Sequence, residues 1–392
     1  MDDTTGAAER AAARGLLGRL NETLPRPLAP EWAAAYEGVP RHGFLPDTVW
    51  LGDALIPCDR RKAPGPWLRA AYDDAPVVTQ INDGAAPGDG ERWPSCSASA
   101  PGIVFRMLDM LDVRDGDRVW EIGTGTGWNA GLLAHRLGSE LVTTVEVDPA
   151  LAEQARDNLR AAGPAPRVVT ADGAALDVDH DLDRFLATCS VRNVPSGWLT
   201  RMKPGGVMLL PWETPWLCYG LLRLVAASDG SASGNFHPHS AFMLLRGQRT
   251  DLRIFRDVVR EDHVPDERSS SVPPWSVTGD DWAAQFAIGL QLPDVWWAWH
   301  EDPEVEGVSA RLWLATLDAT SWAAVDYDGE TDERFTVWEH GRRRLWREVE
   351  AAHCWWRSHA CPRPEHFGLT VTADGRHTPW LHAPDRAVPQ RG

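Results

Sequence analysis

The sequence of 392 residues has little positive charge, few cysteines and no long apolar run. Its 39 lysines and arginines stand against 56 acidic residues, and the net charge of -17 argues against nucleic acid or an anionic membrane surface as a partner, because phosphates would be repelled. A basic peptide is compatible with this charge. Six cysteines without regular spacing predict no disulfide framework. The acidic start Met1–Asp3 has no apolar signal-peptide core, so we expect a cytoplasmic protein outside the membrane.

Tryptophan is distributed unevenly along the chain. Of the 21 tryptophans, 14 lie beyond residue 210, and this part is too apolar and aromatic to be a disordered tail. The length suggests two domains, or one with a large appendage. We predict a first domain over residues 1–212 and a C-terminal α+β region over residues 213–392. Its predicted elements are strands at 217–226, 242–245, 294–299, 310–316 and 321–327, helices at 280–290 and 339–356, and a polar linker at 262–275.

The most informative motif is the glycine-rich stretch Val119–Asn129. An apolar run predicts a buried strand before Gly123, Gly125 and Gly127, and helical spacing follows them. Glycine tolerates positive φ and, without a Cβ, lets the backbone lie against a ligand. In an open α/β sheet the first strand-to-helix turn is the usual cofactor crevice. Trp128 stands where a nicotinamide or flavin site has its third glycine, and the lysine of a phosphate loop is missing, so neither site is indicated.

Acids follow the next two predicted strands. The run at 141–145 leads to Glu146, which suits hydrogen bonds to ribose hydroxyls, and the run at 167–171 ends at Asp172 and Gly173, where a carboxylate can accept from an adenine amino group. Further elements are strands at 185–190 and 207–211, a helix at 198–202 and a tight turn at 203–206. Strands that alternate with helices across short loops predict a parallel, doubly wound α/β sheet.

The E-x-G-x-G-x-G pattern resembles the first motif of S-adenosylmethionine-dependent methyltransferases. The resemblance implies a Rossmann-like class I methyltransferase domain with S-adenosylmethionine as its cofactor. The residues implied in binding it are Glu121, Gly123, Thr124, Gly125, Thr126, Gly127, Trp128, Glu146, Asp172 and Gly173.

Further segments are similar in order and kind to those of protein-L-isoaspartate O-methyltransferases. They are Val39–Pro46, Ala71–Pro76, Ser97–Pro101, Val194–Pro195 and Lys203–Gly206, together with the glycine turn and Asp172–Gly173. The similarity covers residues 30–212. It implies methylation of an aspartate-derived carboxylate in a peptide or protein, with Ser99 as the active-site serine beside the donor methyl. A hydroxyl at Ser97 is a second candidate to orient the carboxylate.

Several of these residues also have a purely structural explanation. Ser99 stands where the predicted helix at 102–111 would have its N-cap. Arg41, His42 and Arg192 are candidate contacts to the substrate peptide, and for each a surface ion pair or a loop hydrogen bond is an equal alternative.

The sequence departs from the family pattern in ways that bear on the substrate. Residues 82–95 form an insertion ahead of Ser97, expected at the mouth of the cleft, Trp128 stands where a tyrosine is common, and residues 213–392 follow the core. The chain resembles extended actinobacterial relatives that methylate an aspartate in a constrained, ribosomally made precursor peptide, whose ester then closes to an aspartimide. We expect the C-terminal region to recognise that peptide.

Three alternatives to this function stay open. One is generic isoaspartyl repair, and another is methylation of a small molecule or nucleic acid, although the charge and the lack of an Asn/Asp-Pro-Pro-Tyr signature speak against nucleic acid. The third is a non-catalytic peptide-binding protein on the same fold. A metal is not expected, because the spacing of His353, Cys354, His359 and Cys361 fits no common zinc module, and we predict that Cys354 packs in the core.

Overall fold

The computed structural model describes residues 3–85, 92–175, 181–238 and 240–391. The insertion predicted at 82–95 is therefore partly outside the described residues. The α-helices are α1 (Asp3–Thr23), α2 (Pro30–Gly38), α3 (Pro64–Ala71), α4 (Pro101–Leu111), α5 (Trp128–Leu137), α6 (Pro149–Ala162), α7 (Ser196–Leu199), α8 (Trp275–Thr278), α9 (Trp282–Gln291) and α10 (Leu345–Ser358). No helix in the described part of the chain is long and apolar enough to cross a membrane.

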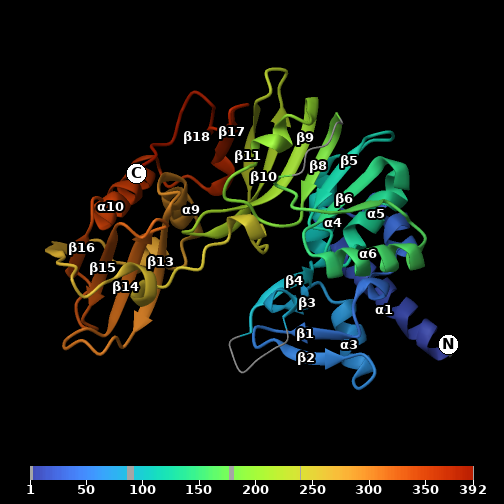
Figure 1. The fold of residues 1–392 in the computed structure, drawn as a ribbon, viewed down its shortest axis with the longest axis horizontal. Coiled ribbons are helices and arrows are strands. Elements are labelled where there is room, and N and C mark those ends of the chain that lie inside the picture. Colours follow the sequence, from blue (N-terminus) through green and yellow to red (C-terminus); the bar gives the residue numbers. More distant parts are fainter. Residues whose placement is uncertain (1–2, 86–91, 176–180, 239, 392) are drawn as a thin grey trace. The chain divides into compact units, whose positions relative to one another are not determined.

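The strands form three sheets (Figure 1). They are β1 (Thr48–Leu51), β2 (Ile56–Asp59), β3 (Val77–Ile81), β4 (Pro94–Ala98), β5 (Val119–Ile122), β6 (Val142–Glu146), β7 (Arg167–Thr170), β8 (Leu182–Ala187), β9 (Met202–Glu213), β10 (Cys218–Ala226), β11 (Ala232–His237), β12 (Asp266–Ser270), β13 (Val295–Glu301), β14 (Ala310–Thr316), β15 (Trp322–Tyr327), β16 (Phe335–His340), β17 (Phe367–Val371) and β18 (His377–Leu381). The strand orders are β2-β1-β3-β4, β18-β17-β11-β10-β9-β8-β5-β6-β7 and β12-β16-β15-β14-β13.

The chain divides into two compact units. The first consists of Met1–Cys189, Pro195–Leu210 and Val225–Gly230, and the second of Ser190–Val194, Pro211–Leu224 and Ser231–Gly392. The boundary that we predict after residue 212 lies within β9, close to the passage between the units. The short segment Ser190–Val194 follows β8 but belongs to the second unit, and the sequence does not indicate this assignment.

The parallel core of the first unit agrees with the sequence prediction. β5 pairs in parallel with β6 and β8, and β7 and β9 continue the sheet on the outer sides of β6 and β8. Every residue of β5 is buried, as in strands that are covered on both faces. α4 packs against β8, while α5 and α6 pack against β6 (Figure 1). The order of the strands therefore reverses between β5 and β8, which is where ligands bind in such sheets.

Two local predictions in the first unit are wrong. The turn at 203–206 lies inside β9, where Gly205 has a φ of +82° and the pairing with β8 shifts register between Leu182 and Arg184. A glycine at positive φ lets a strand carry such an irregularity without ending. The predicted N-cap of α4 is wrong as well, because the helix begins at Pro101 and its N-cap residue is Ala100, which makes no side-chain capping bond.

The second unit contains more strand than its polar segments suggest. Residues 262–275, predicted as a linker, include β12, which pairs with β16, a strand that the sequence pattern does not reveal. The predicted strand at 242–245 is wrong, since only a single bridge joins Leu244 to Ser190. The predicted helix at 339–356 begins later, as α10, because β16 extends to His340. The strands near 294–299, 310–316 and 321–327 and the Asp-capped helix at 280–290 are confirmed.

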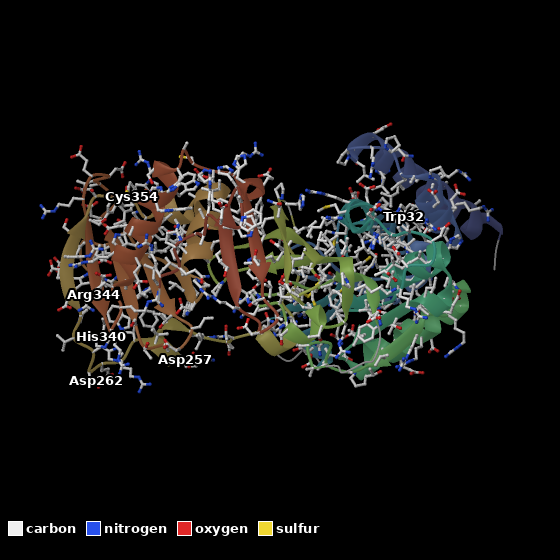
Figure 2. All side chains as sticks on the ribbon, turned by 90° about the horizontal axis from the view of Figure 1, so that it is seen from above. Trp32, Asp257, Asp262, His340, Arg344 and Cys354 are labelled. Atoms are coloured by element: carbon white, nitrogen blue, oxygen red, sulfur yellow. The ribbon has the colours of Figure 1, made fainter. Side chains whose placement is uncertain are left out.

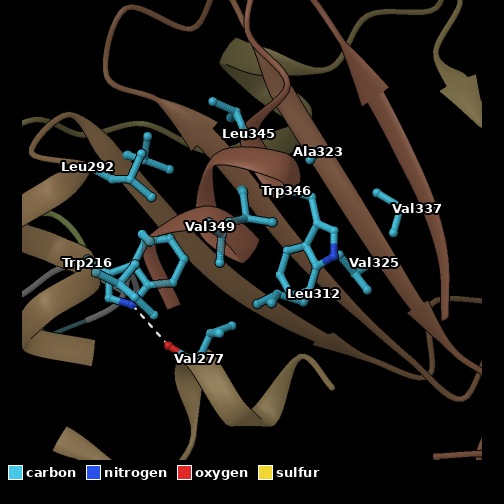
Figure 3. Packing of buried hydrophobic residues seen from close by; sticks show 14 of the residues in the cluster. Trp216, Val277, Leu292, Leu312, Ala323, Val325, Val337, Leu345, Trp346 and Val349 are labelled. Atoms are coloured by element: carbon cyan, nitrogen blue, oxygen red, sulfur yellow. Dashed lines mark hydrogen bonds between the residues drawn. The ribbon is translucent and has the colours of Figure 1, made fainter. Parts of the chain in front are cut away.

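Of the 14 tryptophans in the second unit, seven are buried and four more pack, partly buried, against its two hydrophobic clusters. α10 places Trp346 and Val349 against one face of the five-stranded sheet, and the indole of Trp216 donates to the carbonyl of Val277 at 3.1 Å (Figure 3). On the other face, Trp313 and Trp322 pack with each other. Burial of this aromatic surface stabilises the unit, and it also explains much of the tryptophan enrichment without a partner.

The sulfur and imidazole groups near the end of the chain do not gather into a metal site. Among the described residues, no group of three His, Cys, Asp or Glu side chains is placed to hold a metal ion. His353 stacks on Trp356, and the ring of His359 packs against that of Trp355 with ring centres 4.2 Å apart. Cys354 is exposed, so the prediction that it packs in the core is wrong (Figure 2).

Candidate active site

The turn between β5 and α5 has the backbone that its glycines predict. Gly123, Gly125 and Gly127 have φ values of +94°, +53° and +97°, a region that residues with a Cβ rarely adopt. A Cβ at Gly123 would lie 2.6 Å from the Thr188 hydroxyl oxygen. That hydroxyl donates to the carbonyl of Gly123, and to that of Ile122 at 3.2 Å. Thr188 follows β8, where the order of the strands reverses, so its place in the sheet makes it a candidate site residue that no sequence motif indicates.

Glu146 lies at the end of β6, beside the glycine turn. Its side chain is 6% exposed, and its two oxygens accept from the backbone N–H groups of Gly125 at 2.9 Å and Asp148 at 3.1 Å. The Asp148 side chain caps α6 and accepts from Gln80 of β3 at 3.0 Å. The carboxylate predicted to hold a ribose is therefore fixed against the turn by backbone donors.

Glu121 lies beneath the turn and supports it from inside the sheet. Its fully buried carboxyl accepts from the Asn129 amide at 2.6 Å and from the Thr144 hydroxyl at 2.5 Å. Burial, aided by the nearby charge of Glu146, raises the pKa of Glu121 to about 7, although its hydrogen bonds from Thr144 and Asn129 act in the opposite direction. Thr144 also shares a hydrogen bond with Thr124, at 2.6 Å. Glu121 and Thr124 thus connect the turn to β6 and α5, which is a supporting role and differs from the predicted contact with the cofactor.

Two further predicted cofactor residues are directed into the protein. Trp128 is buried, donates from its indole N–H to the carbonyl of Val39 at 2.9 Å, and packs edge-on against Phe105. Its indole therefore joins α5 to the segment before Arg41. Thr126 is buried too, and its carbonyl accepts from Asn158 at 2.9 Å.

Asp172 and Gly173 form the turn after β7. Asp172 is exposed and accepts from the backbone N–H of Ala174 at 2.9 Å. The carbonyl of Gly173 accepts from the indole of Trp198 at 2.8 Å, and a Cβ at this glycine would lie 2.7 Å from Ile122, the last residue of β5. Only glycine lets this turn approach the end of β5 so closely, which leaves the Asp172 carboxylate at the same edge of the sheet.

The two candidate serines lie where β4 leads into α4. Ser97 pairs with Val78 of β3, and Ser99 follows the end of β4. Cys96, the neighbour of Ser97, has its sulfur 3.3 Å from the position that a Cβ on Gly125 would take. This short distance brings the serine strand next to the glycine turn.

Arg41 fixes the serine segment and is no surface cation. Its side chain is fully buried and donates to the carbonyls of Ala98 at 3.1 Å, Ser99 at 3.0 Å and Ala71 at 2.7 Å. Burial lowers the pKa of Arg41 to about 10, which leaves it charged at neutral pH. The structure therefore gives Arg41 a positioning role in place of the predicted contact with substrate. Its carbonyl partners are remote in sequence, so no local sequence pattern indicates this role.

The other two predicted cations are engaged within the protein. His42 hydrogen-bonds with the Tyr72 hydroxyl at 2.6 Å and lies 3.4 Å from Glu9. Arg192, in the second unit, pairs with Glu213 at 3.2 Å and lies 3.3 Å from the Thr250 hydroxyl. For Arg192 this is the ion-pair alternative, and for His42 it is the hydrogen-bond alternative, because burial lowers the pKa of the His42 imidazole.

The sheet, its strand order and the glycine turn with an acid after the second strand define a class I methyltransferase fold. The protein-L-isoaspartate(D-aspartate) O-methyltransferase family matches residues 38–249, more than half of the chain, so the chain belongs to this family. The match begins and ends later than the range of 30–212 that we infer from motifs. Membership of the family confirms that the chain is a methyltransferase with S-adenosylmethionine as its methyl donor.

Individual relatives agree with the family. The protein-L-isoaspartate O-methyltransferase of Thermococcus onnurineus is 37% identical over 153 residues, which are 38% of this chain and 69% of the relative. That of Ignicoccus hospitalis is 34% identical over 203 residues, 51% of this chain and 82% of the relative. A solved structure of a protein-L-isoaspartate O-methyltransferase has a TM-score of 0.54 and 18% identity, and covers 95% of this chain and 100% of its own. The likeness of fold therefore extends past the family motifs.

Proposed function

We propose that this protein methylates the side-chain carboxylate of an aspartate or isoaspartate residue in a peptide. The observation that supports the proposal is the short distance between Cys96 of β4 and Gly125, because Ser97 and Ser99 flank this contact and Gly125 belongs to the turn that we propose to hold the donor. Gly123, Gly125 and Glu146 would hold the donor, which supplies a methyl group on a positively charged sulfur. The positive φ angles of these glycines and the buried carboxylate fit such a ligand.

The chemistry asks little of the protein beyond positioning. A peptide carboxylate has a pKa of about 4 and is already ionised at neutral pH, so it needs no general base. The hydroxyls of Ser97 and Ser99 would orient one carboxylate oxygen in line with the methyl group, and alignment of this kind is a large part of such catalysis. Arg41 supports them by fixing the carbonyls of Ala98 and Ser99.

We further propose that the substrate is a constrained precursor peptide and that its ester closes to an aspartimide. A methyl ester is a better electrophile than a carboxylate, so the neighbouring backbone nitrogen can attack its carbonyl carbon, forming the imide ring and releasing methanol. The support for this substrate is the sequence insertion before Ser97, together with the exposed aromatic side chains of the second unit, which would contact a longer peptide. Generic isoaspartyl repair is the alternative substrate assignment.

Mass spectrometry separates these possibilities. The protein and donor would be incubated with a short isoaspartyl peptide and, separately, with a constrained precursor peptide that contains aspartate. Gain of one methyl group followed by loss of methanol on the precursor alone supports the maturation role, and turnover of the isoaspartyl peptide alone supports repair. If calorimetry detects no binding of S-adenosylhomocysteine, the remaining alternative is a non-catalytic peptide-binding protein.

A further inference from the structure

The segment Ser190–Val194 leads away from the end of β8 and is held at several points by the second unit. The backbone N–H of Ser190 donates to the carbonyl of Met243 at 2.9 Å, and Arg192 pairs with Glu213 at 3.2 Å. The last of these contacts is made by the backbone N–H of Val194, which donates to Nε2 of His377 at 2.9 Å. We name Ser190–Val194 the β8 loop.

His377 contributes to this contact as a neutral imidazole. His377 is the first residue of β18, and its Nδ1 lies 2.9 Å from the carbonyl oxygen of Gly375. Its ring packs against that of Trp212, with ring centres 6.0 Å apart. A carbonyl can only accept, so Nδ1 must carry the proton and donate it. Nε2 is then the unprotonated nitrogen that accepts from Val194, and both contacts require this one tautomer.

The β8 loop begins two residues after Thr188, in a chain segment that continues directly from β8. Thr188, whose hydroxyl donates to Gly123, precedes Val194 by six residues, a span of at most about 20 Å of extended chain. In open α/β sheets the ligand crevice lies outside the carboxyl ends of the strands, where this loop emerges. The hydrogen bond of Val194 therefore fixes the far end of the segment that follows Thr188 in the chain.

We propose that His377 is a positioning residue for methyl transfer, which holds the β8 loop in its substrate-binding conformation through Val194. The inference rests on the proposed function for the identity of the reaction. It gives the C-terminal hairpin of β17 and β18 a defined role, because this hairpin carries the acceptor that fixes the loop following β8. It also predicts that this role depends on pH.

Protonation of His377 would break the contact, because a second ring N–H would then face the N–H of Val194. Burial lowers the pKa of His377, while its hydrogen bond to Gly375 acts in the opposite direction. The charged groups on the surrounding segments are Arg192 and Glu213, which pair with each other, and Asp374 and Arg376 on the turn before β18. The contact is therefore present at neutral pH and is lost as the pH falls through the pKa of His377.

The test compares pH profiles of kcat/KM on the accepted peptide between about pH 5 and 8. His377→Gln keeps an oxygen that accepts from Val194 but does not titrate. At the acidic end of the profile (the acid limb), we therefore expect kcat/KM of this variant to fall less than that of the wild type. His377→Leu removes the acceptor, and we expect KM for the peptide to rise on the order of tenfold at every pH, because a buried N–H loses its partner. The matched control is His359→Gln, at an exposed histidine, which should follow the wild type.

Two readouts separate this inference from the proposed function and from a loss of folding. Affinity for S-adenosylhomocysteine and the melting temperature, measured on each variant, should change little, since the donor turn is not touched. The amide resonance of Val194 should titrate with His377 in the wild type even where no methylation is found. An acid limb that is unchanged in His377→Gln, or a Val194 resonance that does not move with pH, would overturn the inference.

Discussion

At the residue scale, the donor turn depends on the missing Cβ of Gly123. We predict that Gly123→Ala weakens binding of S-adenosylhomocysteine by at least about tenfold, because the added Cβ meets the Thr188 oxygen at 2.6 Å and the φ is +94°. Isothermal calorimetry measures the affinity. Gly163→Ala is the matched control, since Gly163 has a φ of +105° and no atom within 4 Å of its added Cβ. An equal loss of affinity in the control would show that backbone strain alone, and no contact at the turn, is responsible.

A second prediction at this scale concerns the pH dependence of stability. The pKa of Glu121 rises from 4.5 to about 7 on folding, so the folded chain binds this proton more tightly than the unfolded chain. The free energy of unfolding that it contributes therefore falls as the pH rises from about 4.5 to about 7, and stays low above this window. Glu121→Gln keeps an acceptor without the charge.

We expect the melting temperature of Glu121→Gln to exceed that of the wild type by a few degrees at pH 8, with a difference that shrinks towards pH 5. Scanning calorimetry across this range provides the measurement. Glu22→Gln, at an exposed glutamate of α1, controls for the general effect of removing one negative charge. A constant difference between Glu121→Gln and the wild type at all pH values would contradict the assignment of the proton.

At the scale of single elements, α9 shows a sequence signal that the structure confirms. The carboxylate of Asp281 accepts from the backbone N–H groups of Ala283 and Ala284, both at 3.1 Å. We predict that Asp281→Ala lowers the free energy of unfolding by about 1 kcal/mol, because two N–H groups of the first turn lose their acceptor. Urea denaturation measures this. Asp280→Ala, one residue earlier and exposed, should cost much less, and an equal cost would contradict the capping role.

The elements that the sequence mispredicts share a physical cause. β12 and β16 are polar at many positions, and they form strands because each supplies the pairing partner of the other within the five-stranded sheet. The turn expected at 203–206 has the residues of a turn, yet it lies within β9, because Met202 before it and Val207 after it both pair with β8. In each case hydrogen bonds to a remote strand outweigh a local preference.

At the scale of the whole molecule, the question is what the second unit contributes. Because half of its 14 tryptophans are buried and five more are partly buried, we expect peptide recognition to depend on the few aromatic side chains that remain exposed. Trp282 is 50% exposed and stacks on Tyr219 with ring centres 5.2 Å apart, and Phe255 is 64% exposed. The C-terminal region of residues 213–392 remains, in our proposal, the part that recognises the substrate.

We predict that Trp282→Ala and Phe255→Ala each raise KM for the precursor peptide on the order of tenfold and leave kcat on a short isoaspartyl peptide unchanged. Steady-state kinetics on both peptides measures the split. Ile56→Ala removes a similarly exposed apolar side chain from the first unit and serves as the control. Point variants are preferable to deletion of the chain beyond residue 262, which would also remove β17, β18 and His377. Equal KM values for all variants would refute recognition through these aromatics.

The sequence by itself determined the parallel sheet, the glycine turn and the acid Glu146, because strand alternation, positive φ and the residue after a strand are local properties of the chain. Only the tertiary structure decided what Arg41, Trp128 and Glu121 do. Their partners are set by packing: Arg41 reaches the carbonyl of Ser99, 58 residues away, and Trp128 that of Val39, 89 residues away. Partners so distant in sequence are chosen by the way the elements pack, and a buried arginine and an exposed one have the same appearance in a sequence.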